Sequence, residues 1–193
     1  MFRFLFTAEN REGFNVEAAM AAGQDYYEDV FVEEIYVEVQ EKYKRALDEA
    51  KIKVEKKVPS GLTLRCMRVS VSRAIDNCVK NSIRHLKEKA QGKRLITLRA
   101  KNVLKDGQWV TNLSVTDNAS GIEKDKIDKM VKPFVSGSGG MGLGLSIVRT
   151  VCEIHGGEMS LHSKWGFWTT VLLQFPKKEI QRKKGKRGSH YGS

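Results

Sequence analysis

The chain has 193 residues, of which 40% are hydrophobic, enough to build the core of one domain of ordinary size. Its net charge of +11 is uneven, because residues 177–187 hold seven Lys or Arg and one Glu, which is +6. No apolar run approaches the roughly 20 residues of a membrane helix, and Cys66, Cys78 and Cys152 show no metal-ligand spacing. These features exclude a membrane-spanning segment within this chain and a cysteine metal centre, and they favour a cytoplasmic setting.

The apolar pattern predicts helices and strands in the following order. Residues 1–29 are an N-terminal segment, either the end of an upstream element or a strand that docks on the domain. We then expect a helix at 32–50, strands from 52 and from 62, a helix at 68–90, strands at 95–100 and 109–117 around the Asp106-Gly107 turn, helices at 122–131 and 142–155, and strands at 159–163 and 168–175.

Hairpins and a few helices, rather than regular strand–helix–strand units, predict an α+β fold. We expect a two-layer sandwich in which helices cover one face of a mostly antiparallel sheet. The domain should span residues 30–176 and be followed by a basic tail at 177–193. That tail allows attraction to nucleic acid or anionic lipid, but the basic stretch has no interleaved aromatic residues, which favours a solvated tail over nucleic-acid binding.

Polar side chains share one face of the predicted helix at 68–90. Asn77 and Asn81 are one helical turn apart, and Arg84 and His85 follow on the same side. An amide oxygen is a suitable Mg²⁺ ligand, and an Arg beside it can contact a phosphate. Chance alignment of surface residues is the alternative for this helix taken alone.

Two further motifs follow along the chain. Asp117 ends a predicted strand and is followed by small residues, so that its carboxylate could accept from an amino group such as that of adenine. An ordinary strand-to-helix turn is the alternative. The glycine-rich stretch 137–144 runs into a predicted helix, where bare backbone N–H groups and the helix dipole favour a phosphate over the alternative of a flexible surface loop.

The order of these motifs resembles the ATP-binding domain of sensor histidine kinases. The resemblance rests on Asn77-x-x-x-Asn81, Asp117-x-Ala119-x-Gly121, Pro133-Phe134 and Gly140-x-Gly142-x-Gly144, and it covers most of the chain. It implies the Bergerat fold of the GHKL ATPase superfamily and binding of ATP with Mg²⁺. Ala119 and Trp168 depart from the family pattern, which commonly has glycine at both positions.

The resemblance also implies roles for individual residues. Asn81, helped by Asn77, would bind Mg²⁺, and Arg84 would contact the phosphates as the third catalytic residue. His85 would lie near the sugar or base, Asp117 would accept from the adenine amino group with Gly121 giving room, and Phe134 would begin a lid at 135–141. The expected nucleotide contacts are His85, Asp117, Ala119, Gly121, Ile122, Phe134, Gly140, Met141, Gly142, Leu143, Gly144, Leu145, Thr169 and Thr170.

The resemblance leaves two functions open. Hydrolysing relatives typically carry a glutamate four residues before the Mg²⁺ asparagine, where this chain has Asn77, and Asp76 points about 100° away around the helix. This favours a histidine kinase, while an ATPase or ATP-switched scaffold is the alternative. No histidine lies in an acceptor pattern, so we expect a histidine-containing dimerisation or phosphotransfer domain outside this chain, a response regulator downstream, and a possible homodimer.

Overall fold

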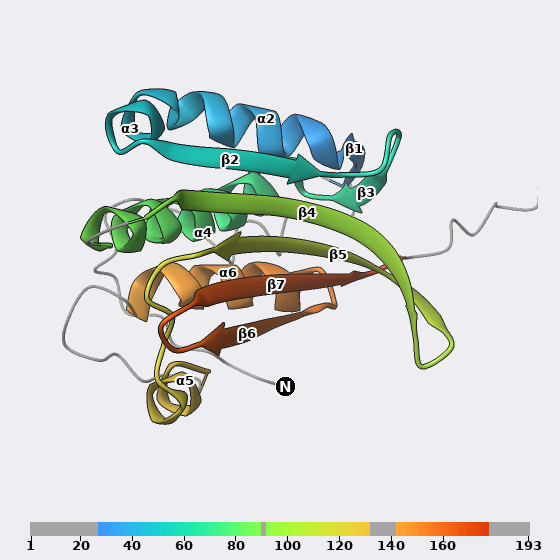
Figure 1. The fold of residues 1–193 in the computed structure, drawn as a ribbon. Helices are drawn as coiled ribbons and strands as arrows, with labels where there is room; N and C mark the ends of the chain where they lie inside the picture. The colour runs from blue at the N-terminus through green and yellow to red at the C-terminus, as the bar shows by residue number, and fades with distance from the viewer. Residues whose placement is uncertain (1–26, 90–91, 132–141, 178–193) are drawn as a thin grey trace, which may run out of the picture.

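The computed structural model describes residues 27–89, 92–131 and 142–177. A five-stranded sheet forms the body of the domain, with the order β2-β4-β5-β7-β6 (Figure 1). β2 and β4 pair in parallel, and the other neighbours are antiparallel. The strands are β2 (Ile52–Lys57), β4 (Arg94–Lys105), β5 (Gln108–Asp117), β6 (Glu158–Lys164) and β7 (Trp168–Pro176).

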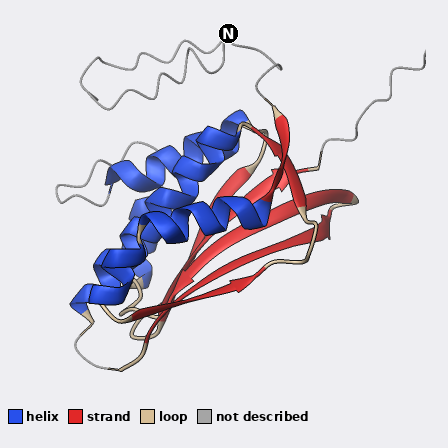
Figure 2. Ribbon diagram, turned by 90° about the horizontal axis from the view of Figure 1, so that it is seen from above, coloured by secondary structure: helices blue, strands red, loops and turns tan. Residues whose placement is uncertain are grey.

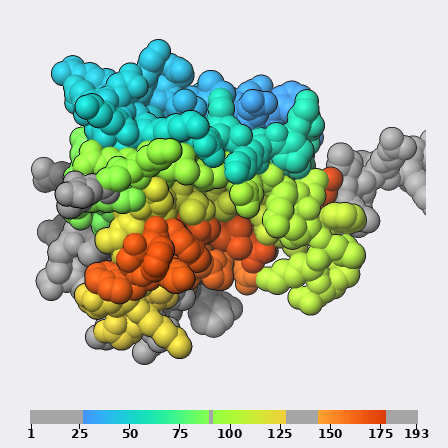
Figure 3. Space-filling model, viewed as in Figure 1, coloured from blue at the N-terminus to red at the C-terminus, as the bar shows by residue number. Residues whose placement is uncertain are grey.

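The helices gather on one side of this sheet (Figure 2). They are α2 (Val32–Lys42), α3 (Lys44–Glu49), α4 (Arg68–Glu88), α5 (Lys124–Val131) and α6 (Gly142–Ile154). The opposite face of the sheet lies at the molecular surface, with α5 at its lower edge (Figure 3). The predicted α+β sandwich with a mostly antiparallel sheet is therefore confirmed.

Alternating burial explains why the sheet has one core face. In β5, Leu113 and Val115 are buried while their neighbours are only partly covered, as expected for a half-buried strand. α4 carries the matching apolar stripe without an interior Gly or Pro. The residues predicted for that stripe are all buried: Val71, Ile75, Cys78, Val79 and Leu86.

A small second sheet lies beside α2. β1 (Glu28–Phe31) pairs antiparallel with β3 (Thr63–Cys66). The boundary expected after residue 29 therefore falls inside β1, and the extent of the domain stays a prediction. The rest of the N-terminal segment and nearly all of the basic tail lie outside the described residues.

The single helix predicted at 32–50 is wrong, because the chain breaks at Tyr43. Its backbone N–H is shared between the carbonyls of Val39 and Gln40, at 3.3 and 3.2 Å. Tyr43 packs against the core, and the neighbouring Lys42 forms an ion pair with Asp76 of α4 at 2.6 Å. We attribute the break to these tertiary contacts, which the helical period alone does not contain.

A buried histidine joins α6 to α4. Nε2 of His155 accepts from the backbone N–H of Met67, the residue before α4, at 3.1 Å. The ring proton must then lie on Nδ1, which donates to the carbonyl of Val151 in α6 at 2.7 Å. His155 thus fixes the end of one helix against the start of the other.

Candidate functional site

The first turn of α6 packs against the asparagine face of α4. A Cβ added at Gly144 would lie 3.2 Å from Nδ2 of Asn81 and 3.5 Å from Oδ1 of Asn77. A Cβ at this position would therefore crowd the amide of Asn81 and make ordinary contact with that of Asn77. The two motifs that the sequence places 63 positions apart (144 − 81) meet at one point, so these predicted residues are brought together.

Asn77 is oriented by its own helix. Its Nδ2 donates to the carbonyl of Arg73 at 2.9 Å, which leaves Oδ1 on the side of Gly144. Asn77 and Asn81 are both half-buried. An amide oxygen beside the N-terminus of a helix suits a metal–phosphate group, because the oxygen can bind the cation while the helix end favours the anion.

Arg84 and His85 continue this face of α4. Nη2 of Arg84 lies 3.3 Å from Nε2 of His85, and Nδ1 of His85 lies 3.6 Å from a carboxylate oxygen of Glu88. Both side chains are half-buried, so they lie at the surface and can meet a ligand. Asp76 belongs to another side of the helix, where Lys42 neutralises it at 2.6 Å.

Asp117 lies at the end of β5, with only 5% of its surface exposed. Oδ2 accepts from the hydroxyl of Ser82 in α4 at 2.8 Å, and Oδ1 accepts from the backbone N–H of Ala119 at 3.2 Å. Burial raises the pKa of Asp117, and the two hydrogen bonds oppose that rise, together with the charges of His85 and Lys89. The carboxylate is thus held in place from two sides.

The turn after β5 is closed by the hairpin that joins β6 and β7. Gly121 has φ of +66°, and a Cβ there would lie 2.2 Å from the carbonyl oxygen of Lys164. Gly166 N–H donates to the carbonyl of Ser120 at 2.6 Å, and Ile122 N–H donates to the hydroxyl of Ser163 at 2.8 Å. The space that Gly121 leaves is therefore filled by protein backbone, and its contact with a base stays a prediction.

The pairing register separates the two candidate threonines. Thr169 pairs with Asp117 and lies on the same face of the sheet, whereas Thr170 pairs with Thr116 on the other face. The hydroxyls of Thr170 and Thr116 lie 2.8 Å apart. Thr169 is therefore the one positioned beside Asp117, although the sequence left both open.

The remaining predicted residues are less informative. Ala119 is buried, and so is Leu145, which belongs to the core. Gly142 and Leu143 belong to the first turn of α6. Phe134, Gly140, Met141 and the predicted lid lie outside the described residues.

Two residues near Asp117 were not predicted. Ser82 occupies a core position of α4 between Val79 and Leu86, and a hydroxyl at such a position needs a partner, which was the available signal. Nζ of Lys89 donates to the carbonyls of Asn118 and Lys93 at 2.7 and 3.1 Å. Because these contacts depend on the end of β5 and the residue before β4, no local pattern indicates them.

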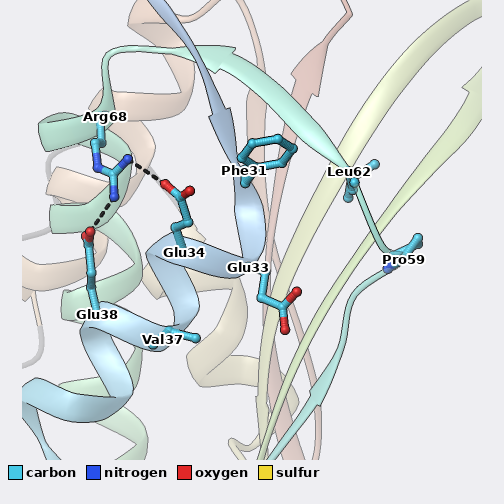
Figure 4. A pocket seen from close by; sticks show the side chains of 9 residues that line it. Phe31, Glu33, Glu34, Val37, Glu38, Pro59, Leu62 and Arg68 are labelled. Carbon is cyan, nitrogen blue, oxygen red and sulfur yellow. Dashed lines mark hydrogen bonds and ion pairs between the residues drawn. The ribbon is translucent and has the colours of Figure 1, made fainter.

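A separate groove lies on α2 and the small sheet (Figure 4). Phe31, Val37 and Leu62 supply its apolar lining, and Arg68 lies at one side, where it pairs with Glu34 and Glu38. Among the predicted nucleotide contacts that the structure describes, none lines this groove.

Residues 67–179 match the family model described as histidine kinase-, DNA gyrase B-, and HSP90-like ATPase. Among curated relatives, the alginate biosynthesis sensor protein KinB of Pseudomonas aeruginosa is 31% identical over 58% of this chain and 18% of its own length. Histidine protein kinase DivJ of Caulobacter vibrioides is 30% identical over 61% of this chain and 19% of its own length. The chain therefore spans about a fifth of these relatives.

Solved structures show the same fold. The catalytic domain of histidine kinase ThkA superposes with a TM-score of 0.64 at 20% identity, covering 78% of this chain and 95% of that domain. ThkA in complex with the response regulator TrrA superposes with a TM-score of 0.63 at 18% identity, over 86% of this chain and 47% of that one. Across residues 27–89, 92–131 and 142–177, every helix is too short or too polar to span a membrane.

Proposed function

Because the chain belongs to the histidine kinase-, DNA gyrase B- and HSP90-like ATPase family, we propose that it is the ATP-binding catalytic domain of a histidine kinase. It would bind Mg-ATP and transfer the γ-phosphoryl group to a histidine on a dimerisation or phosphotransfer domain outside this chain. The observation that carries the proposal is the contact at Gly144, where the start of α6 lies so close to the two amides of α4 that an added Cβ would crowd Asn81 and touch Asn77.

The residues around that contact fit a metal-bound triphosphate. The amide oxygens of Asn81 and Asn77 would bind Mg²⁺, and the charge of Arg84 would face the phosphates. The metal, when bound, would neutralise charge on the phosphate oxygens. Backbone N–H groups of the first turn of α6 would hold the phosphate from the other side.

The purine end would lie against β5. Asp117 would accept a hydrogen bond from the 6-amino group of adenine, with Thr169 beside it on the same sheet face. Ser82 belongs to the helix that carries Asn81 and donates to Asp117 at 2.8 Å, so the two ends of the site share α4. This shared helix would allow one nucleotide to reach both the carboxylate and the amides.

Transfer is favoured over hydrolysis by the groups beside the metal position. Asn77 cannot take a proton from water at neutral pH, and Asp76 is engaged by Lys42 at 2.6 Å. Phosphoryl transfer needs mainly positioning and charge neutralisation, which these residues can supply. An ATPase or ATP-switched scaffold is the alternative, and rapid steady-state hydrolysis by the isolated chain would favour it.

The acceptor histidine would belong to another domain. Among the described residues, His155 is 4% exposed and uses both ring nitrogens in hydrogen bonds. His162 lies on β6 beside Ser160, and His85 lies within the proposed site itself. ThkA was crystallised with a response regulator, and we propose such a regulator as the downstream partner here.

The test is phosphotransfer from labelled ATP. The full chain is mixed with Mg²⁺, labelled ATP and candidate histidine-containing domains, and the products are treated with acid and with base. A label on the acceptor that is lost in acid and kept in base supports the proposal. A folded chain that binds no ATP in the presence of Mg²⁺ would overturn it.

A further inference from the structure

Asp117 combines deep burial with a proposed role that requires a negative charge. It is 95% buried, yet purine recognition requires it to stay ionised, since only the carboxylate accepts on both oxygens. An isolated charge at such a depth is costly unless donors surround it. The hydrogen-bond donors that face Asp117 therefore decide whether its carboxylate stays ionised.

Ser82 is the side-chain donor among those groups. It is 4% exposed, and its hydroxyl reaches Oδ2 at 2.8 Å, within the range of a normal O–H···O bond. The Ala119 backbone N–H serves the other oxygen at 3.2 Å. Each oxygen then keeps one lone pair, so the carboxylate is held by the protein and still able to accept from a ligand.

The position of Ser82 in α4 connects the Ser82–Asp117 hydrogen bond to the proposed metal site. Ser82 follows Asn81 directly, so the bond ties the end of β5 to the helix that carries the proposed Mg²⁺ ligands. The charged groups near Asp117 are His85 and Lys89. Both lie C-terminal to Ser82 on the α4 side, and Lys89 is directed to the carbonyls of Asn118 and Lys93.

We propose that Ser82 is a positioning residue for purine recognition, which orients Asp117 and keeps it ionised so that an exocyclic amino group is preferred over an oxygen at the 6-position. This inference rests on the proposed function, because it assumes that the nucleotide base meets Asp117. Ser82 itself need not touch the nucleotide.

Removal of the Ser82 hydroxyl should change how ATP affinity depends on pH. Asp117 binds the amino group as a carboxylate, so ATP affinity is full above the pKa of Asp117 and declines as the pH falls through it. Burial already raises this pKa, and the Ser82 hydrogen bond lowers it. Ser82→Ala should therefore raise it further and move the decline in affinity to higher pH.

The experiment compares ATP with inosine triphosphate, which carries an oxygen at the 6-position, in the presence of Mg²⁺. Affinities are measured by calorimetry from neutral to mildly acidic pH for the wild type, Ser82→Ala and Ser82→Thr. The ratio of the two affinities removes effects of triphosphate titration, which both nucleotides share. Ser70→Ala, which deletes another buried hydroxyl from α4, is the matched control.

We expect Ser82→Ala to reduce the preference for ATP over inosine triphosphate by about tenfold, near the lower end of what one hydrogen bond to a charged group contributes. The remaining preference should decline at higher pH than in the wild type. Ser82→Thr should restore both, and Ser70→Ala should change neither. An unchanged ratio and pH profile in folded Ser82→Ala would overturn the inference while leaving the proposed function intact.

Two further outcomes are decisive. If Ser82→Ala does not fold, Ser82→Cys, a weak donor of similar size, replaces it, and equal behaviour of the Cys and Thr variants overturns the inference. If the folded wild type binds neither nucleotide, the proposed function fails, and the role of Ser82 fails with it.

Discussion

The purine end and the phosphate end of the proposed site are built differently. Asp117 is 5% exposed and holds hydrogen bonds on both oxygens, so the purine end is complete before any ligand arrives. Asn77, Asn81 and Arg84 are half-buried, and the amides of the two asparagines face the start of α6. The purine end therefore depends on buried packing, and the phosphate end depends on open polar groups and the absence of a side chain at Gly144.

This difference predicts that substitutions at the phosphate end impair chemistry and leave the fold intact. Asn81→Ala should give the largest effect, a loss of phosphotransfer of roughly a thousandfold, since metal charge stabilisation is worth several kcal/mol. The rate of acceptor labelling at saturating Mg²⁺ measures it. Asn112→Ala, which removes an amide from the open sheet face, should leave the rate unchanged. Equal rates for Asn81→Ala and the wild type would remove Asn81 from the site.

A substitution at the purine end should instead damage the fold. Gly121→Ala should lower the free energy of unfolding by roughly 3 kcal/mol, combining left-handed strain with a collision against Lys164. Gly61→Ala is the control, because Gly61 has φ of +72° and open space around it, and so reports the strain alone. Denaturant unfolding compares the two variants. If they lose equal stability, the tight approach of the β6–β7 turn is contradicted.

Gly144→Val should weaken ATP binding more than it lowers the stability of the fold. The added methyl groups would meet the amides of Asn77 and Asn81, and we expect ATP affinity to fall about a hundredfold, or roughly 2.7 kcal/mol. Ser146→Val places the same side chain on an exposed position of α6 and should bind normally. Calorimetry with Mg-ATP and thermal unfolding together provide the test. Normal affinity in Gly144→Val would mean that the start of α6 does not hold the phosphates.

Asp117→Asn should have the smallest effect of the four. The amide keeps the shape but loses the charge, and one hydrogen bond to a charged group is worth about 2 kcal/mol, or roughly thirtyfold in ATP affinity. Asp106→Asn, at a turn where the backbone has φ of +49°, is the control and should bind ATP as the wild type does. Unchanged affinity in Asp117→Asn would exclude Asp117 from the site.

Sequence patterns identified the residues of this site, but they did not identify which distant residues contact them. Asn77 and Asn81 could be assigned to one face because helical geometry fixes the direction of residues one turn apart. The choice between Thr169 and Thr170 depended on the register of β7 against β5, which no local pattern contains. The neighbour of Gly121 is likewise a hairpin more than forty positions away along the chain.

The same distinction holds for the fold. The α+β class followed from the order of helices and strands, whose apolar periods are local. The sheet order and the break of the first helix at Tyr43 did not follow, because both depend on contacts between distant segments. Ser82 is an intermediate case, since its core position implied a partner without naming Asp117.

The parallel pairing of β2 with β4 has a consequence for how the chain folds. β4 and β5 are joined by the short turn at Asp106-Gly107 and can pair early. Pairing of β2 with β4 instead closes a loop that contains β3 and the whole of α4. Closing that long loop is entropically slow compared with forming a hairpin. The helix that carries the asparagines lies within this loop. Formation of the β2–β4 ladder should therefore coincide with acquisition of nucleotide affinity during refolding.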